Sequence, residues 1–452
     1  MSNLHSSQAM TSNSSDRKSG GDLRGFPKSD KFRNTVISIF CALLLLVLLH
    51  WCWRHYEYTR FMGAVRNLQA AGEPVLPADL REPPDDGQNP VPKWRQAARD
   101  LDRQTEELQR DFSFVDLEFP LSKAEADRLR RIVAINGKSL ADAAAAGQLT
   151  GEPMWHIRVT SPIINVLLPD LNEQRKVARL LYAAALDAHH RGDDRESLTY
   201  IEQILQQKRA VDHQFGIISH LVAIGIGAMA DQALRQLGPS LRVGDTPPAA
   251  SRRQVLNLVA ELLDDTDQRH GQRRAFQDER MLQADSVLAA ENGTLNLWTI
   301  SGSRNPATSS HLSAYFLSPT LYGDGVIMLY HTTKVMAASQ APDWPSCAKQ
   351  LQTLHLDKYK GDPRHYLLSA LTPSFERALQ QDFRLMTENR LSAVLLACMV
   401  YAHDHDGRCP QSLNALVPAG LPAVPHDLMA SARPLRYRPG PDPIVYSVGE
   451  DG

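Results

Sequence analysis

The sequence lacks the features that mark several common classes of protein. Five cysteines in 452 residues are too few for a scaffold held together by disulfides. The formal net charge of −2 leaves no overall positive field, so nucleic acid is not an expected partner. There is no Gly-x-x-x-x-Gly-Lys-Ser/Thr loop, no Gly-x-Ser-x-Gly elbow, no His-Glu-x-x-His pair and no Cys-x-x-Cys pair. No catalytic or cofactor-binding residue is predicted, and an enzyme would need a site assembled from distant residues.

Disulfide formation is restricted to three positions. Cys41 and Cys52 lie in or beside an apolar segment, which leaves Cys347, Cys398 and Cys409 for at most one disulfide. Cys398 and Cys409 are separated by a predicted helix end, and the sequence leaves open whether they pair.

One long apolar run determines where the chain is located. Residues 34–53 carry no formal charge, with His50 neutral, and as a helix they span a hydrocarbon core of roughly 30 Å. Aromatic residues gather at one end of the run, as in an interfacial belt: Trp51, Trp53, Tyr56 and Tyr58. The residues after the run are bulky where a signal peptidase requires small ones. The sequence therefore predicts an uncleaved transmembrane helix at 34–53 as the contact with the membrane.

Basic residues are more numerous before this helix than after it. The two sets are Arg17, Lys18, Arg24, Lys28, Lys31 and Arg33 before it, and Arg54, Arg60 and Arg66 after it. Because cytoplasmic flanks carry the excess of Lys and Arg, the N-terminus is predicted to be cytoplasmic and the large C-terminal part extracytoplasmic.

The composition divides the chain into successive parts. Polar residues dominate the start, and prolines gather between Pro74 and Pro92, as in a linker or an extended wrap. The predicted parts are a disordered cytoplasmic tail (1–33), the transmembrane helix (34–53), a juxtamembrane helix with a Pro-rich linker (54–92), an α-helical extracytoplasmic domain (93–372), and a long helix with a small α+β tail (373–452).

The periodicity beyond residue 93 is helical. Apolar stripes at helical spacing cross 177–188 and 198–205 and flank Gly192. Asp193 and Glu196 suit the start of the second helix. The pair predicts a helical hairpin similar to one tetratricopeptide-type repeat, but no fixed period extends it into a solenoid.

Other elements follow from similar signals. Further helices are predicted at 214–237, 252–264, 268–290, 320–338 and 373–402. Ser122 and Glu125 have capping-box spacing ahead of another helix, whereas the small and polar residues of 296–319 predict a long loop. Short strands at 435–438 and 444–447 predict a β-hairpin. The predicted fold class is therefore mainly α, with one N-terminal transmembrane helix, a multi-helix domain and a small α+β tail.

Several local patterns imitate functional motifs. Gly225–Ala230 fits a loose dinucleotide fingerprint but lacks the flanking strands, so close helix packing is the preferred interpretation. His403–Asp406 is dense in metal ligands, yet neighbouring helical residues point in different directions, which favours a polar helix end. Arg191–Asp193 is interpreted as an inter-helix turn, and the mixed charges of 273–280 as a solvated or inter-helix ion-pair face.

The C-terminal residues carry a resemblance to known families. YAHDHDGRCP at 401–410, PLRYR at 434–438 and YSVGEDG at 446–452 are similar to the tail of an uncharacterised family of single-anchor membrane proteins from planctomycete-type bacteria. The same motifs resemble the C-terminal module of the major pseudopilins of type II secretion. Upstream, LQAAGEP at 68–74 and the hairpin at 177–205 resemble the first family.

The pseudopilin resemblance implies a calcium site in the tail. It nominates Asp451 as a carboxylate ligand, because calcium prefers hard oxygen donors. This chain departs from the pseudopilin pattern at His426–Met429, where those proteins have an Asp-Pro-Trp/Phe-Gly step. The chain is not expected to be a pilin, because the Glu that pilins carry near the start of the apolar helix is missing after Arg33.

The sequence suggests three possible functions. The first is a non-enzymatic protein of the bacterial inner membrane, single-pass, that binds or organises an envelope protein partner. The second is an accessory protein of secretion with a calcium-binding tail. The third is an envelope enzyme with a dispersed site. A charged pocket with perturbed pKa values would favour the enzyme, and a concave or apolar helical face would favour the partner-binding protein.

Overall fold

The computed structural model describes most of the chain as two units. It covers residues 30–452 except 82, 83, 85, 106–116, 169, 296–310, 360, 361, 373, 374, 432, 441, 442 and 450–452. The first unit is Met1–Trp53 and the second is Arg54–Gly452. Helix α1 (Asp30–Ala70) contributes its residues up to Trp53 to the first unit and its last turns to the second.

The described part of the first unit is a helix with exposed apolar side chains. These exposed side chains run from Phe32 to Trp53. The helix at Phe32–Ala70 is long and apolar enough to cross a membrane, and the apolar window in it is not buried by the rest of the protein. A signal sequence has the same character, so the helix is suited to be either an anchor or a signal sequence.

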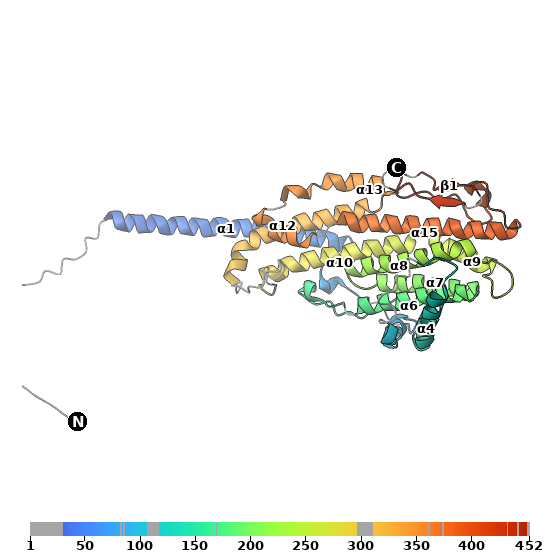
Figure 1. Cartoon of the computed structure of the whole chain (residues 1–452). Helices are drawn as coiled ribbons and strands as arrows, with labels where there is room; N and C mark the ends of the chain where they lie inside the picture. Colours follow the sequence, from blue (N-terminus) through green and yellow to red (C-terminus); the bar gives the residue numbers. More distant parts are fainter. Residues whose placement is uncertain are drawn as a thin grey trace, which may run out of the picture. The chain divides into compact units, whose positions relative to one another are not determined.

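The second unit is mainly helical in its described part (Figure 1). Its longer helices are α2 (Val91–Arg99), α4 (Lys123–Ile135), α5 (Gly137–Gly147), α6 (Asp170–His190), α7 (Asp194–Asp212), α8 (Ile217–Leu237), α9 (Arg252–Leu263), α10 (Thr266–Glu291), α12 (His311–Ala338), α13 (Trp344–Leu351), α14 (Tyr366–Leu371) and α15 (Phe375–Asp404). Short 3-10 turns lie at η1 (Pro77–Asp79), η3 (Ile163–Asn165), η4 (Gly238–Ser240), η5 (Gln352–Leu354), η6 (Leu356–Tyr359), η7 (Pro363–His365) and η8 (Leu413–Leu416).

The predicted helical hairpin is confirmed as α6 and α7. Gly192 occupies the turn at φ +80°, a conformation that glycine adopts without strain. The Asp193 side chain then caps α7 by accepting the N–H of Glu196 at 2.9 Å. The capping box at Ser122 and Glu125 is also present at the start of α4.

The core of the second unit is built from long helices that lie side by side. Figure 1 shows α6, α7, α8, α10 and α15 stacked, and each neighbouring pair is in contact. Helix α8 is apolar enough to pass as a membrane span, but two-thirds of its apolar window is buried inside the unit, as in a core helix. A Cβ at Gly227 would come within 3.2 Å of Leu385 on α15, so Gly227 serves close helix packing, whereas a Cβ at Gly225 would meet nothing within 4 Å.

The predicted loop at 296–319 is wrong over its last part. Residues 296–310 lie outside the described residues, but α12 begins at His311 and contains Pro319. Proline removes the N–H that would bond the carbonyl of Tyr315. The Ser318 hydroxyl donates to that carbonyl at 2.7 Å, which compensates for the missing backbone bond.

The segment after α1 wraps onto α10. Glu73 Oε2 accepts from Arg280 and from Gln277, both at 2.7 Å, and Glu73 Oε1 pairs with Arg273. The Arg280 side chain is only 1% exposed. Of the mixed charges of α10, Arg280 is therefore buried in an ion pair with the segment after α1, whereas Arg273 makes its pair at the surface with half of its side chain exposed.

The tail has the predicted β-hairpin. Strands β1 (Arg436–Arg438) and β2 (Ile444–Tyr446) pair antiparallel, with Tyr437 opposite Val445. All five cysteines of the chain are described, and all are free, so Cys398 and Cys409 form no disulfide here. Burial, with Cys409 adding to it, raises the pKa of the Cys398 thiol to about 12.

Candidate functional site

The candidate site lies where the end of α7 meets the first half of α10. Helix α7 ends at Asp212, and His213 is its C-cap, so both side chains stand at the helix terminus. Gly216, at φ +89°, precedes α8. Its N–H donates to the Asp278 carboxylate on α10 at 2.8 Å. This turn ties the end of α7 to α10.

Beside this turn, His220 on α8 joins carboxylates from two other helices. Its Nδ1 lies 2.5 Å from Asp212 Oδ1, and its Nε2 lies 2.9 Å from Asp382 Oδ1 on α15. The exposed fractions of these three side chains are 3% or less. Gln268 on α10 also donates to Asp382. Pairing on both sides is what a buried imidazolium requires, because an unpaired buried charge is strongly destabilising.

Burial disfavours the charged forms of His220 and Asp212, and their pairing within the cluster outweighs the effect of burial. Burial lowers the pKa of His220, but Asp382 and Asp212 raise it to about 10. Burial raises the pKa of Asp212, but the charge and hydrogen bond of His220 hold it below the usual value. At neutral pH the cluster therefore contains a charged imidazole and ionised Asp212.

A helical glycine makes room for this cluster. A Cβ at Gly271, in the second turn of α10, would overlap the carboxylate of Asp212. Glycine in a helix interior is normally unfavourable by about 1 kcal/mol relative to alanine. Its presence at this position is explained by the close approach of Asp212.

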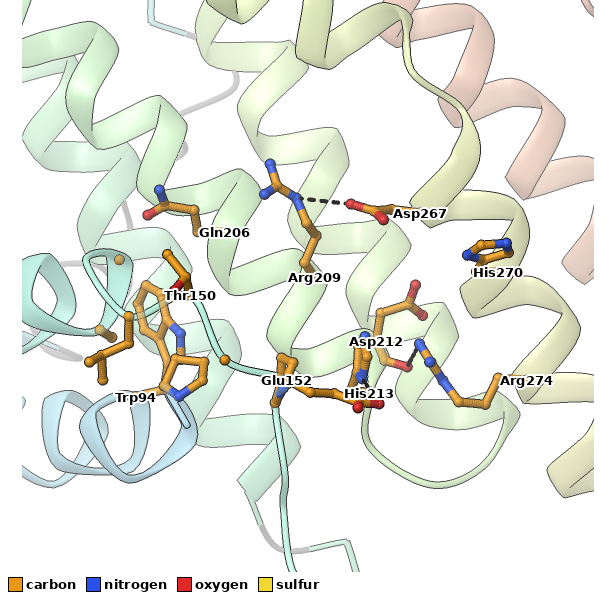
Figure 2. Close-up of a pocket in the computed structure, with 16 residues that line it drawn as sticks. Trp94, Thr150, Glu152, Gln206, Arg209, Asp212, His213, Asp267, His270 and Arg274 are labelled. Carbon is orange, nitrogen blue, oxygen red and sulfur yellow. Dashed lines mark hydrogen bonds and ion pairs between the residues drawn. The ribbon is translucent and has the colours of Figure 1, made fainter. Parts of the chain in front are cut away.

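A cavity of about 600 Å³ opens beside the cluster (Figure 2). Its walls come from α2, the segment 146–153, α7 and α10. The polar and aromatic lining residues include Trp94, Thr150, Glu152, Gln206, Arg209, Asp212, His213, Asp267, His270 and Arg274. Side chains of both charge signs therefore line one space.

The charged contacts on the cavity wall differ in strength. Arg209 Nη2 pairs closely with Glu261 on α9, and its remaining contact is longer. Arg209 Nε lies 3.4 Å from Asp267 Oδ2, and His213 Nδ1 lies 3.8 Å from Glu152 Oε1. Figure 2 shows each pair reaching across from different segments. Both of these contacts are longer than a buried salt bridge, and the one from His213 carries no charge on the imidazole at pH 7. A ligand can therefore displace Asp267 or Glu152 at low energetic cost.

Arg274 adds a guanidinium to the wall. Its Nη2 lies 3.4 Å from the Asp212 carbonyl oxygen, whereas its buried Nε has no acceptor among the described residues. Burial, with the charge of Arg274 adding to it, lowers the pKa of His213 to about 4, so that imidazole is neutral at pH 7. The wall therefore carries the positive charge of Arg274 beside a neutral His213, and this charge suits an anionic group.

The predicted calcium site is not tested by this structure. Asp451 lies outside the described residues. Within the described part of the tail, Asp427 is buried and accepts from the Ser447 hydroxyl at 2.9 Å and from the N–H groups of Val448 and Met429 at 3.0 Å. Its oxygens hold the tail to β2.

The other predicted pattern of metal ligands is a helix end. His405 Nδ1 lies 2.8 Å from the carbonyl oxygen of Tyr401, and Asp404 pairs with Arg252 at 3.3 Å. Gly407 continues into a turn at φ +82°. Across the part of the chain that the structure describes, no group of three or more His, Cys, Asp or Glu side chains is placed to hold a metal ion.

Sequence reasoning missed the cavity. Its lining residues lie between Pro90 and Arg274, and of these only Arg274 belongs to a pattern that the sequence singled out. One usable signal was present in α10, where Gly271 stands among the buried polar residues Gln268 and Gln272. A helical glycine between buried glutamines indicates a close polar contact.

Comparison with known proteins assigns no family to the chain. No protein-family model, no curated protein and no solved structure matches it. The cavity and the apolar helix are therefore the features that bear on function.

Proposed function

We propose that the chain is a single-pass protein of the bacterial inner membrane whose extracytoplasmic helical domain binds an envelope protein partner without catalysis. The exposed apolar helix supports the anchor, and the aromatic residues at its end suit a membrane interface. The excess of Lys and Arg in the residues before it supports a cytoplasmic N-terminus.

The observation that carries the proposal is the charged cavity between α7 and α10. Its wall carries the guanidinium of Arg274, whose Nη2 lies 3.4 Å from the Asp212 carbonyl oxygen, and that of Arg209, which pairs with Glu261 and more weakly with Asp267. Guanidinium groups bind carboxylates with two parallel hydrogen bonds. We infer that the partner presents a carboxylate, on an acidic side chain or at a chain end, to Arg274 and Arg209.

An envelope enzyme is the second candidate, because Asp212 and His220 in the buried cluster have perturbed pKa values. Two features favour binding instead. Both ring nitrogens of His220 are occupied, and its side chain is buried, so it has no proton to exchange with a ligand. His213 faces the cavity, but no described side chain forms a nucleophile hydrogen-bonded to it.

The secretion-related alternative rests on the tail resemblance. It predicts that calcium raises the melting temperature of the full-length protein relative to a chelator. No change in melting temperature between the two conditions would count against a calcium-binding tail at Asp451.

The binding proposal is tested by affinity purification of the tagged full-length protein from its own membranes. The variant Arg274→Gln is compared with Arg253→Gln, a change at an exposed arginine away from the cavity. We expect one or more envelope proteins to copurify with the wild type and with Arg253→Gln, and to be lost with Arg274→Gln at an unchanged melting temperature. Retention by Arg274→Gln, or recovery of no partner by the wild type, would overturn the proposal.

A further inference from the structure

The first turns of α12 present apolar side chains on the surface of the second unit. Phe316 is 56% exposed and Leu317 is 47% exposed. The stretch 312–323 contains no formally charged residue. Adjacent exposed apolar side chains on an uncharged helix indicate a surface that meets an apolar phase or a partner.

These turns are tied to the residue at which the second unit begins. Arg54 Nε donates to the Ser318 hydroxyl at 3.1 Å, and its guanidinium carbon lies 5.2 Å from the centre of the Tyr315 ring. Arg54 Nη2 also pairs with Glu291 Oε1 on α10 at 2.5 Å. The arginine charge is therefore compensated, and the start of α12 is fixed beside Arg54.

Two further contacts give the direction of α12 relative to the last turns of α1. The rings of Tyr58 and Tyr322 have centroids 5.3 Å apart. Phe61 lies against Gly325, where a Cβ would come within 2.7 Å of its ring. Residue numbers rise together along both helices in the contacts Arg54–Ser318, Tyr58–Tyr322 and Phe61–Gly325, so α12 runs parallel to the last turns of α1.

Parallel packing places the start of α12 on the side where the chain enters the unit. With a rise of about 1.5 Å per residue, Phe316 lies about 3 Å beyond Ser318 in that direction, and His311 about 10 Å beyond it. Arg54 is bonded to Trp53, the last residue of the apolar run. Because that link is covalent, the groups that contact Arg54 stay within a few residues' length of the run's end at any angle between the two units.

We propose that Tyr315–Leu317 form a second contact with the membrane, in which these side chains lie in the interfacial region of the bilayer that holds residues 34–53. Aromatic and apolar residues on an uncharged helical face are suited to this region. The neighbouring Arg54–Glu291 pair adds no net charge there. The inference rests on the proposed anchor, and it adds that the helical domain is held against the membrane surface.

The experiment places a photoreactive benzophenone amino acid at single positions of the full-length protein in phospholipid nanodiscs. The test positions are Phe316 and Leu317. Leu46 in the apolar run reports on the anchor itself. Tyr330 is the matched control, because it is 63% exposed on the same helix and lies about 18 Å from Ser318 in the opposite direction.

Lipid adducts are measured by mass spectrometry after irradiation. We expect adducts at Leu46, Phe316 and Leu317, with at least a tenfold lower yield at Tyr330. The second contact would be overturned, and the anchor left intact, if Leu46 gave lipid adducts while the yields at Phe316 and Leu317 were no higher than the yield at Tyr330. An absence of adducts at Leu46 as well would overturn both. Cross-links from Phe316 to a protein in native membranes, in place of lipid, would also overturn the second contact.

Discussion

Among single residues, His220 is the clearest to test because it joins α8 to α7 and α15. Its replacement in His220→Gln leaves Asp212 and Asp382 buried without their cation. We expect the free energy of unfolding of the second unit to fall by about 3–5 kcal/mol. Chemical denaturation measures the loss. The control is His270→Gln, at an exposed histidine on α10, and an equal loss in this control would contradict the role of the cluster.

The pKa of His220 determines how its contribution to stability changes with pH. The folded pKa is about 10 and the ordinary value is 6.5, so the folded state binds the proton more tightly. The contribution is fully present below pH 6.5 and is lost as pH rises through about 10. We expect the stability difference between wild type and His220→Gln to be largest near pH 6 and to shrink steadily toward pH 10. A difference that stays constant over this range would show that His220 is not charged in the folded protein.

Alanine substitutions at two helical glycines distinguish the effect of close packing from the effect of helix propensity. In Gly271→Ala the new methyl group overlaps the Asp212 carboxylate, and we expect a destabilisation of about 2 kcal/mol from overpacking. In Gly225→Ala nothing lies within 4 Å of the new Cβ, and we expect a stabilisation of about 0.5–1 kcal/mol. Thermal unfolding measures both. Similar changes of melting temperature in the same direction for both variants would contradict the assigned role of Gly271.

At the scale of elements, Glu73 connects the segment after α1 to α10. Glu73→Gln removes the carboxylate that pairs with the buried Arg280 and with Arg273. We expect the free energy of unfolding to fall by about 2 kcal/mol, because a charged hydrogen bond to a buried group is removed. We also expect faster proteolysis within 73–92. The control Glu173→Gln removes an exposed pair with Lys176 and is expected to change stability by less than about 1 kcal/mol.

The elements that sequence reasoning predicted are those whose signals are local. The caps at Ser122 and Asp193, the apolar stripes of α6 and α7, and the turn before β2 depend on residues a few positions apart. The start of α12 could not be predicted in this way. Pro319 is a strong local signal for a helix break, and the compensating bond from Ser318 is visible only in the structure.

At the scale of the whole molecule, the sequence predicted the apolar helix but not the cavity. A long apolar run is a property of consecutive residues, so composition alone identifies 34–53. The cavity is formed by α2, the segment 146–153, α7 and α10, whose proximity depends on tertiary packing. The positions of Arg209 and Arg274 in the sequence therefore carry no sign that they face one space.

The division into two units leads to a prediction about truncation. The core that contains Phe61 and Val65 also includes Val287 and Leu329, so the last turns of α1 belong to the fold of the second unit. We expect the fragment 54–452 to unfold cooperatively with a melting temperature close to that of the full chain. The fragment 71–452 lacks the buried Phe61 and Val65, and removal of a single buried aromatic side chain already destabilises a domain by about 3–5 kcal/mol. We therefore expect it to be aggregated or to melt at least several degrees lower. Equal melting temperatures for the two fragments would show that the fold begins after α1, and the Tyr58 and Phe61 contacts with α12 would then be dispensable.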